Sequence, residues 1–254
     1  MSATSNEKMD DGASPTGNTR EHPVALRVPG IDCVEKIVII LDLSPEMNSK
    51  HFRSLEKRTI IHLTKRAIEN FLHNKHSINA KHEFALMVFR ERAEWLVDFQ
   101  SKPDDLITQL NHYFPIDSTP AEIDLSVIFD CLHSKIKLPK AAGADVAPAY
   151  IVRAIMVYGR SHSVPTLEKP CASYDSLLSS PYFFLDILYV HEIPSDDNVC
   201  TDVYTALCQL DETEKAYVLE VSTSMTRLLE NVTILLAHAL QRPPQADANY
   251  ALTS

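Results

Sequence analysis

The sequence predicts an α/β fold, in which helices cover both faces of a mostly parallel sheet with one antiparallel edge strand. Two observations lead to this prediction. Strand-like apolar stretches alternate with amphipathic helical stretches from residue 35 onward, and one pair of strands is separated only by a short turn. The expected element order is therefore β-α-β-β-α-α-β-α-β-α-β-α, where the hairpin gives the antiparallel pair and the helical connections give parallel neighbours.

The first half of the domain is expected to contain the hairpin. Residues 37–41 (Ile-Val-Ile-Ile-Leu) are uniformly apolar, as in a central strand that is covered on both faces. A helix is expected within residues 51–73, because apolar residues recur there near a 3.6-residue period. Strands at 84–89 and 95–99 enclose a short polar turn at 90–92, so they are expected to pair as the hairpin.

The second half repeats the alternation of helices and strands. The expected elements are, in order, helices at 103–113 and 125–136, a strand at 151–157, a helix at 173–179, a strand at 182–190, a helix at about 199–210 and a strand at 217–221. Ser222 and Thr223 are expected to cap a final helix whose apolar side runs from Met225 to Leu240.

The chain divides into three regions by composition. Residues 1–30 are polar and hold three of the chain's five glycines; they cannot bury enough apolar surface to offset the entropy of ordering, and are predicted to be disordered. Residues 31–240 are predicted to form the domain, and residues 241–254 a proline-containing tail. Because the folded part is nearly free of glycine, glycine-rich phosphate loops are absent and nucleotide binding is disfavoured.

Charge and cysteine usage narrow the expected location and partners. The formal net charge is −10, with 34 acidic against 24 basic residues, which argues against binding to nucleic-acid phosphates. The five cysteines are odd in number and form no C-x-x-C pair, as in a reduced intracellular protein. The N-terminus has no apolar signal-peptide core, and no apolar run is long enough for a bilayer. A cytoplasmic and nuclear location, with no membrane partner, is therefore expected.

A candidate metal loop follows the first strand, in the stretch "EKIVIILDLSPEM". Asp42-Leu43-Ser44-Pro45-Glu46 differs at one position from the loop pattern Asp-x-Ser-x-Ser. Because this loop follows a parallel strand, it is expected at the carboxyl edge of the sheet, where ligands of such sheets bind. A hard divalent cation prefers oxygen ligands of the kind that Asp and Ser supply.

The element order and this loop together resemble the von Willebrand factor A (VWA) domain. In that family a divalent cation is held by three loops, and the resemblance implies Asp42, Ser44 and Glu46 in the first, Thr119 in the second and Tyr158 in the third. Glu46 stands where the family has a second Ser, and Tyr158 stands where it has an Asp.

Two interpretations of this degenerate site stay open. Either the loops bind magnesium, or Asp42 and Ser44 serve as a helix-capping and loop-ordering pair. The second is favoured, because a phenol is a poor replacement for a carboxylate and Arg160 adds positive charge nearby. We therefore predict no metal and no cofactor.

The sequence offers no set of catalytic residues. His73, His76 and His82 lack a Cys, Asp or Glu at zinc-ligand spacing, and Cys131 is expected to be a small core residue. No Gly-x-Ser-x-Gly elbow is present for a serine hydrolase. We therefore expect the chain not to be an enzyme.

The C-terminal segment is the main candidate for partner binding. Residues 237–245 are expected to leave a helix and become extended, proline-rich and free to be bound. Tyr250 adds an apolar side chain to an otherwise polar terminus, as in many docking peptides. A frayed terminus without a partner is the alternative.

Five stretches carry a closer resemblance, which covers residues 30–252. They are "EKIVIILDLSPEM", "HEFALMVF", "YIVRAIMVYGR", "PYFFLDILYVHE" and "LLAHALQRPPQADANYAL". The chain resembles the family of VWA-like, MERIT-type scaffold subunits of the BRISC deubiquitinase and of the breast-cancer-susceptibility-protein A complex.

The resemblance implies a non-catalytic subunit that binds an arm subunit built from ubiquitin-conjugating-enzyme-variant (UEV) folds. Through that arm it would join a JAMM zinc metalloprotease and its pseudo-enzyme partner, which act on non-degradative signalling ubiquitin chains; ubiquitin is a further candidate partner. The residues proposed for docking to a UEV groove are Leu240, Gln241, Arg242, Pro243, Pro244 and, further on, Tyr250. The alternatives are a metal-dependent VWA ligand-binding module and, less favoured, an autonomous hydrolase.

Overall fold

The sheet and its helices form three layers in the computed structural model, which describes residues 33–50, 58–116, 122–140, 147–211, 213–222 and 224–248. The strands are β1 (Val34–Asp42), β2 (Glu83–Phe89), β3 (Ala93–Gln100), β4 (Tyr150–Tyr158), β5 (Phe183–Val190) and β6 (Val218–Val221). The helices are α1 (Ile60–Ile78), α2 (Asp104–His112), α3 (Ser126–Lys135), α4 (Ala172–Leu178), α5 (Cys200–Cys208) and α6 (Met225–Ile234). Two short 3-10 helices are η1 (Pro45–Asn48) and η2 (Gln245–Asp247).

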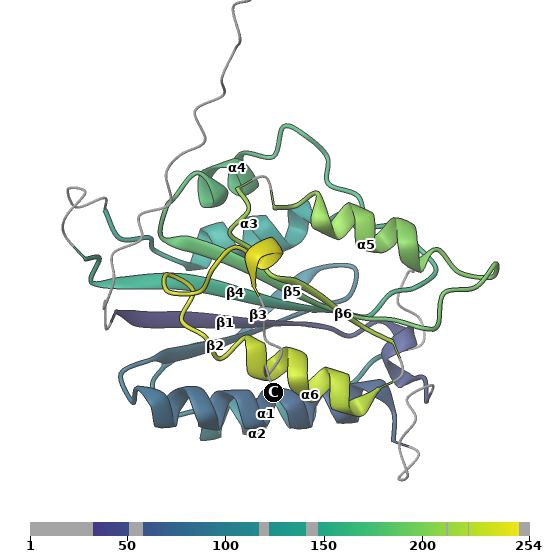
Figure 1. The fold of residues 1–254 in the computed structure, drawn as a ribbon, viewed down its shortest axis with the longest axis horizontal. Helices are drawn as coiled ribbons and strands as arrows, with labels where there is room; N and C mark the ends of the chain where they lie inside the picture. Colours follow the sequence, from purple (N-terminus) through teal and green to yellow (C-terminus); the bar gives the residue numbers. More distant parts are fainter. Residues whose placement is uncertain are drawn as a thin grey trace, which may run out of the picture.

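The predicted fold class is confirmed. The six strands lie in the order β3-β2-β1-β4-β5-β6, and only the β2–β3 pair is antiparallel. Helices α1, α2 and α6 cover one face of the sheet, and α3, α4 and α5 cover the other (Figure 1). From β1 the chain adds β2 and β3 on one side of the sheet. It then crosses to the other side of β1 and adds β4, β5 and β6, so the switch in strand order lies beside β1.

Strand β1 shows why the apolar runs form central strands. Ile37, Ile39 and Leu41 pack in the core with α1 and α6, while Val38 and Ile40 pack in the core with α3 and α5. Both faces of the strand are therefore removed from water, which a continuous apolar sequence requires. Within the described part of the chain, no helix combines the length and the apolar character needed to cross a membrane.

Three helix boundaries differ from the prediction, namely the end of α1 and both ends of α6. Helix α1 continues past residue 73 to Ile78. A lysine at position 75 suggests a surface position in the sequence, but Lys75 is buried and its ammonium pairs with Glu35, so the helix still packs on the domain there. Helix α6 begins after Ser224, whose hydroxyl accepts from the Arg227 N–H at 3.2 Å. The expected caps were Ser222, which precedes this position, and Thr223, which lies outside the described residues.

The end of α6 is the larger correction, since the helix stops at Ile234 and not near Leu240. Beyond it, the carbonyl of Leu236 accepts from Lys75 Nζ at 3.2 Å, and that of Ala237 accepts from Arg153 Nη1 at 3.1 Å. The chain leaves the helix and brings these carbonyl oxygens to two buried cations, which need acceptors. The predicted disordered segment, residues 1–30, lies outside the described residues.

Candidate functional site

Asp42 ends strand β1 at the carboxyl edge of the sheet, where it connects two loops. Its buried carboxylate accepts the Ser44 N–H at 2.9 Å and the Gly159 N–H, which follows β4, at 3.1 Å. Asp42 therefore orders the loops after β1 and β4. Ser44, which was expected to help cap a helix, precedes η1 and makes no side-chain capping bond.

Arg160 lies at the centre of this edge, with its side chain fully buried. Its Nε and Nη2 donate to the two carboxylate oxygens of Asp42 at 3.3 and 3.4 Å. Nη2 also donates to the Arg90 carbonyl in the β2–β3 hairpin at 2.6 Å, and Nη1 to the Glu122 carbonyl before α3 at 3.3 Å. One guanidinium thus joins four segments, and its planar set of donors suits this arrangement.

Tyr158 is the last residue of β4 and is buried among aromatic rings. Its ring lies 6.2 Å from that of Phe89 and 6.0 Å from that of Tyr189, measured between centroids. Burial raises the pKa of its phenol well above the ordinary value, so the hydroxyl stays neutral. The Tyr189 hydroxyl on β5 in turn donates to the Arg160 carbonyl at 3.1 Å and so fixes the loop that follows β4.

Glu46 binds the loop that follows β4 through the backbone. Its carboxylate accepts the Ser161 N–H at 2.5 Å. Burial raises the pKa of Glu46, and the hydrogen bond from Ser161 opposes this only in part. Thr119, the predicted residue of the second loop, lies outside the described residues.

The donor set of this edge does not fit a divalent cation. Both oxygens of Asp42 are bound to N–H groups, and a guanidinium contacts them where a metal ion would need its ligands. Ser44 Oγ is buried and has no hydrogen-bond partner among the described residues, so one hydroxyl of the family pattern remains unused. Across the described ranges, no group of three or more His, Cys, Asp or Glu side chains is arranged to hold a metal ion.

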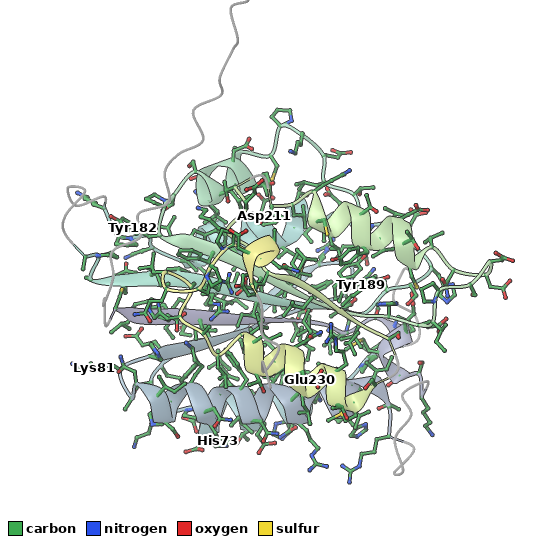
Figure 2. The ribbon with its side chains drawn as sticks, viewed as in Figure 1. His73, Lys81, Tyr182, Tyr189, Asp211 and Glu230 are labelled. Carbon is green, nitrogen blue, oxygen red and sulfur yellow. The ribbon has the colours of Figure 1, made fainter. Side chains whose placement is uncertain are left out.

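A second buried ionic cluster lies toward the other end of the strands. Glu35 on β1 pairs with Lys75 and accepts from Arg153 Nη1 at 3.3 Å, while Arg153 Nε donates to Asp186 at 2.6 Å. Burial raises the pKa values of both carboxyls, but the neighbouring cations outweigh it and hold them below their ordinary values. Figure 2 marks the two ends of β5 by Tyr182, which directly precedes the strand, and Tyr189, which is next to its last residue.

Residues 236–248, which we name the carboxy-terminal strap, complete this cluster. Both guanidinium nitrogens Nη1 and Nη2 of Arg242 donate to the Asp186 carboxylate, the first at 2.9 Å. The same guanidinium lies 4.0 Å from the centre of the Tyr217 ring, and the Tyr217 hydroxyl donates to the Pro243 carbonyl at 2.8 Å. The strap is thus fixed across the start of β6.

Gln245 closes the free edge of β6. Its side-chain oxygen accepts the Val218 N–H at 2.6 Å, and its side-chain nitrogen donates to the Val218 carbonyl at 2.9 Å. These are the two bonds that a neighbouring strand would make, so the amide covers the edge. An open hollow of about 450 Å³ lies beside it, between α5, β6 and the strap.

The expectation of a free, extended tail is wrong for residues 241–248. Arg242 is held because Asp186 needs a cation, and Gln245 is held because the β6 edge needs hydrogen-bond partners. Gln241, just before Arg242, and Pro243, between the two anchors, are exposed, and Leu240 packs partly against Ala239 and its neighbours. Pro244 is half-buried, and Tyr250 lies outside the described residues. The signal that sequence reasoning missed was the pair of charges Arg153 and Asp186 inside otherwise apolar strands.

The curated relatives match most of this chain and about two thirds of their own length. "BRISC and BRCA1-A complex member 1" of Danio rerio is 34% identical over 252 residues, which cover 94% of this chain and 67% of that protein. The protein of the same name from Xenopus laevis is 33% identical and covers 89% of this chain and 70% of its own length. The Homo sapiens protein of that name is 33% identical, and the match covers 90% of this chain and 71% of that protein. No protein-family model matches the chain.

Solved structures agree on the fold. The crystal structure of the SpRpn10 VWA domain superposes with a TM-score of 0.54 at 12% sequence identity, covering 83% of this chain and 98% of that one. The von Willebrand factor type A structure from Catenulispora acidiphila superposes with a TM-score of 0.54 at 15% sequence identity, covering 82% of this chain and 43% of that one. At these identities the likeness establishes a VWA fold and nothing about activity.

Proposed function

Because the chain belongs to the family of BRISC and BRCA1-A complex member 1, we propose that it is a non-catalytic scaffold subunit of such deubiquitinase complexes. In this role it binds the UEV-fold arm subunit and, through it, a JAMM zinc metalloprotease with its pseudo-enzyme partner. The substrates of the assembly are non-degradative signalling ubiquitin chains, and its work includes the DNA-damage response. Ubiquitin is a further candidate partner, and the cytoplasm and nucleus are the proposed locations.

The observation that carries the docking part of this proposal is the anchored strap. Arg242 and Gln245 fix the backbone, while the side chains of Gln241 and Pro243 between and beside them face solvent. A partner that binds this stretch meets a segment already ordered, so less conformational entropy is lost on binding than with a loose tail. We therefore assign the exposed side of the strap, together with its half-buried Leu240 and Pro244, as the arm-binding surface.

The chemistry of the thiols supports a non-catalytic role. Burial raises the pKa values of Cys131, Cys200 and Cys208, whereas a nucleophilic cysteine needs a lowered pKa. Cys200 instead donates to the Glu192 carbonyl at 3.6 Å, within the loop that follows β5. We propose that these cysteines pack and do not react.

The direct test is binding of the purified arm subunit to strap variants. The double substitution Gln241→Ala with Pro243→Ala removes exposed side chains and leaves both anchors in place. We expect the dissociation constant, measured by surface plasmon resonance, to rise about tenfold, as for loss of interface hot-spot contacts.

Glu230→Ala, an exposed change on α6, is the matched control and is expected to leave binding unchanged. Deleting the whole strap is a poorer test, because it also removes Arg242 from the buried Asp186. An affinity within twofold of wild type for the double variant would show that the partner binds elsewhere. Cleavage of ubiquitin chains by the purified chain alone would contradict the non-catalytic assignment.

A further inference from the structure

We propose that Arg160 is a permanent internal replacement for the divalent cation of the VWA loop face. The VWA fold implies a cation bound between the loops that follow β1 and β4 and the segment before α3. In this chain Arg160 itself belongs to the loop after β4. Its guanidinium contacts Asp42, at the end of β1, and the Glu122 carbonyl, before α3. The proposal holds whether or not the chain joins a deubiquitinase complex.

The geometry of Arg160 matches the role of a central cation. Its acceptors are the carboxylate of Asp42 and the carbonyls of Arg90 and Glu122, at distances between 2.6 and 3.4 Å. These acceptors come from segments far apart in the sequence, so the positive charge holds the loop face together. A lysine in this place would supply a charge, but its donors share one nitrogen and cannot span acceptors that the guanidinium reaches through three separate nitrogens.

The electrostatics of the edge exclude a divalent ion beside Arg160. The charges of Asp42 and Arg160 balance each other, and both side chains are fully buried. The second nearby carboxylate, Glu46, already accepts the Ser161 N–H. A metal ion would therefore meet a buried positive charge and would have to displace it from the Asp42 carboxylate.

A consequence for recognition follows from the burial of Arg160. With none of its side-chain surface exposed, the guanidinium cannot pair with a carboxylate on a partner protein. Recognition of an acidic ligand through a central cation is thus lost at this face. The loop face becomes a fixed structural element that does not respond to the concentration of magnesium or manganese.

The experiment compares two substitutions matched in size, Arg160→Lys, which keeps a charge, and Arg160→Gln, which keeps polarity without charge. Thermal unfolding of each is measured with and without about 5 mM MnCl₂ or methylguanidinium chloride. We expect Arg160→Gln to lower the melting temperature by about 10 °C, because the buried Asp42 loses the guanidinium and keeps only backbone N–H partners. The fall in melting temperature is expected to be clearly smaller for Arg160→Lys.

Added cations separate a central-cation role from simple packing. In Arg160→Ala, which opens space next to Asp42, we expect manganese or methylguanidinium to restore part of the lost melting temperature. No rescue is expected in the double variant Asp42→Asn with Arg160→Ala. In wild type, isothermal titration with MgCl₂ and MnCl₂ should show no binding.

Three outcomes would overturn the proposal. The first is Asp42-dependent binding of manganese by the wild-type chain. The second is an Arg160→Gln variant as stable as, or more stable than, Arg160→Lys. The third is a folded Arg160→Ala variant that neither cation stabilises, because its loss would then reflect packing alone.

Discussion

Replacing Arg242 with alanine is expected to lower the free energy of unfolding by about 3 kcal/mol. Removing one member of a buried ion pair costs about 3–5 kcal/mol when the other charge is left alone. Asp186 is not left alone, because it keeps Arg153 at 2.6 Å and the Tyr217 N–H at 2.9 Å. The ion-pair loss therefore belongs at or below the low end of that range.

Two further contacts of Arg242 add to this loss. The guanidinium lies 4.0 Å from the centre of the Tyr217 ring, a cation–π contact worth about 1 kcal/mol. Its Nη2 also donates to the Lys215 carbonyl at 2.9 Å. Because the side chain is only 2% exposed, screening by solvent removes little of the total.

Urea unfolding at pH 7, followed by circular dichroism, measures the change directly. For a chain of 254 residues, 3 kcal/mol corresponds to a fall in melting temperature of about 6–12 °C. Arg242→Lys is the matched variant, since it keeps the charge but loses the two parallel bonds, and a loss of about 1–2 kcal/mol is expected. A loss below 1 kcal/mol for Arg242→Ala, with normal folding, would refute the view that the strap is part of the folded domain.

Three more predictions rest on other contacts of the described residues. Glu46→Gln should match or exceed wild-type stability at pH 7, because the amide oxygen can still accept the Ser161 N–H while the buried charge is gone; urea unfolding checks this, and a loss above about 1 kcal/mol would contradict it. Asp186 has a lowered pKa in the folded state, so its contribution is present above the ordinary value of 3.8 and is lost as pH falls below it; unfolding curves from pH 5 to pH 2.5 should show a weaker acid dependence in Arg242→Ala. Gln245→Ala should open the β6 edge and favour association, measured by analytical ultracentrifugation against Asp247→Ala, and an unchanged monomer fraction would count against this role.

The strands and their order could be predicted because they depend on local, repeated signals. Strand β1 was identified by its unbroken apolar run, and the β2–β3 hairpin by its short polar turn. The ends of α1 and α6 could not be predicted, because Lys75 and Arg153 are buried only through partners distant in the sequence. A periodicity analysis counts Lys75 as a surface position and so shortens α1, whereas the apolar residues up to Leu240 continue the helical pattern and so lengthen α6.

The candidate site shows the same limit. The substitutions Glu46 and Tyr158 were visible in the sequence and pointed away from a metal. That Arg160 enters the site itself was not visible, since its contacts with the Arg90 and Glu122 carbonyls join residues about 70 and 38 positions apart. The strap was likewise missed, because nothing in the proline-rich terminus itself indicates that Arg242 forms an ion pair with a buried carboxylate on β5.

Both ends of the sheet are therefore fixed by arginines, Arg160 at the carboxyl edge and Arg153 with Arg242 toward the amino end. An arginine side chain is always charged at physiological pH, so these three arginines are not switched by a change of pH in that range. A bound metal ion exchanges with solvent and its occupancy follows its concentration, whereas a guanidinium on the chain does not. If the proposed scaffold role is right, these internal cations keep the loop face and the strap in one arrangement whatever the concentration of free metal ions, which a metal-dependent face would not do.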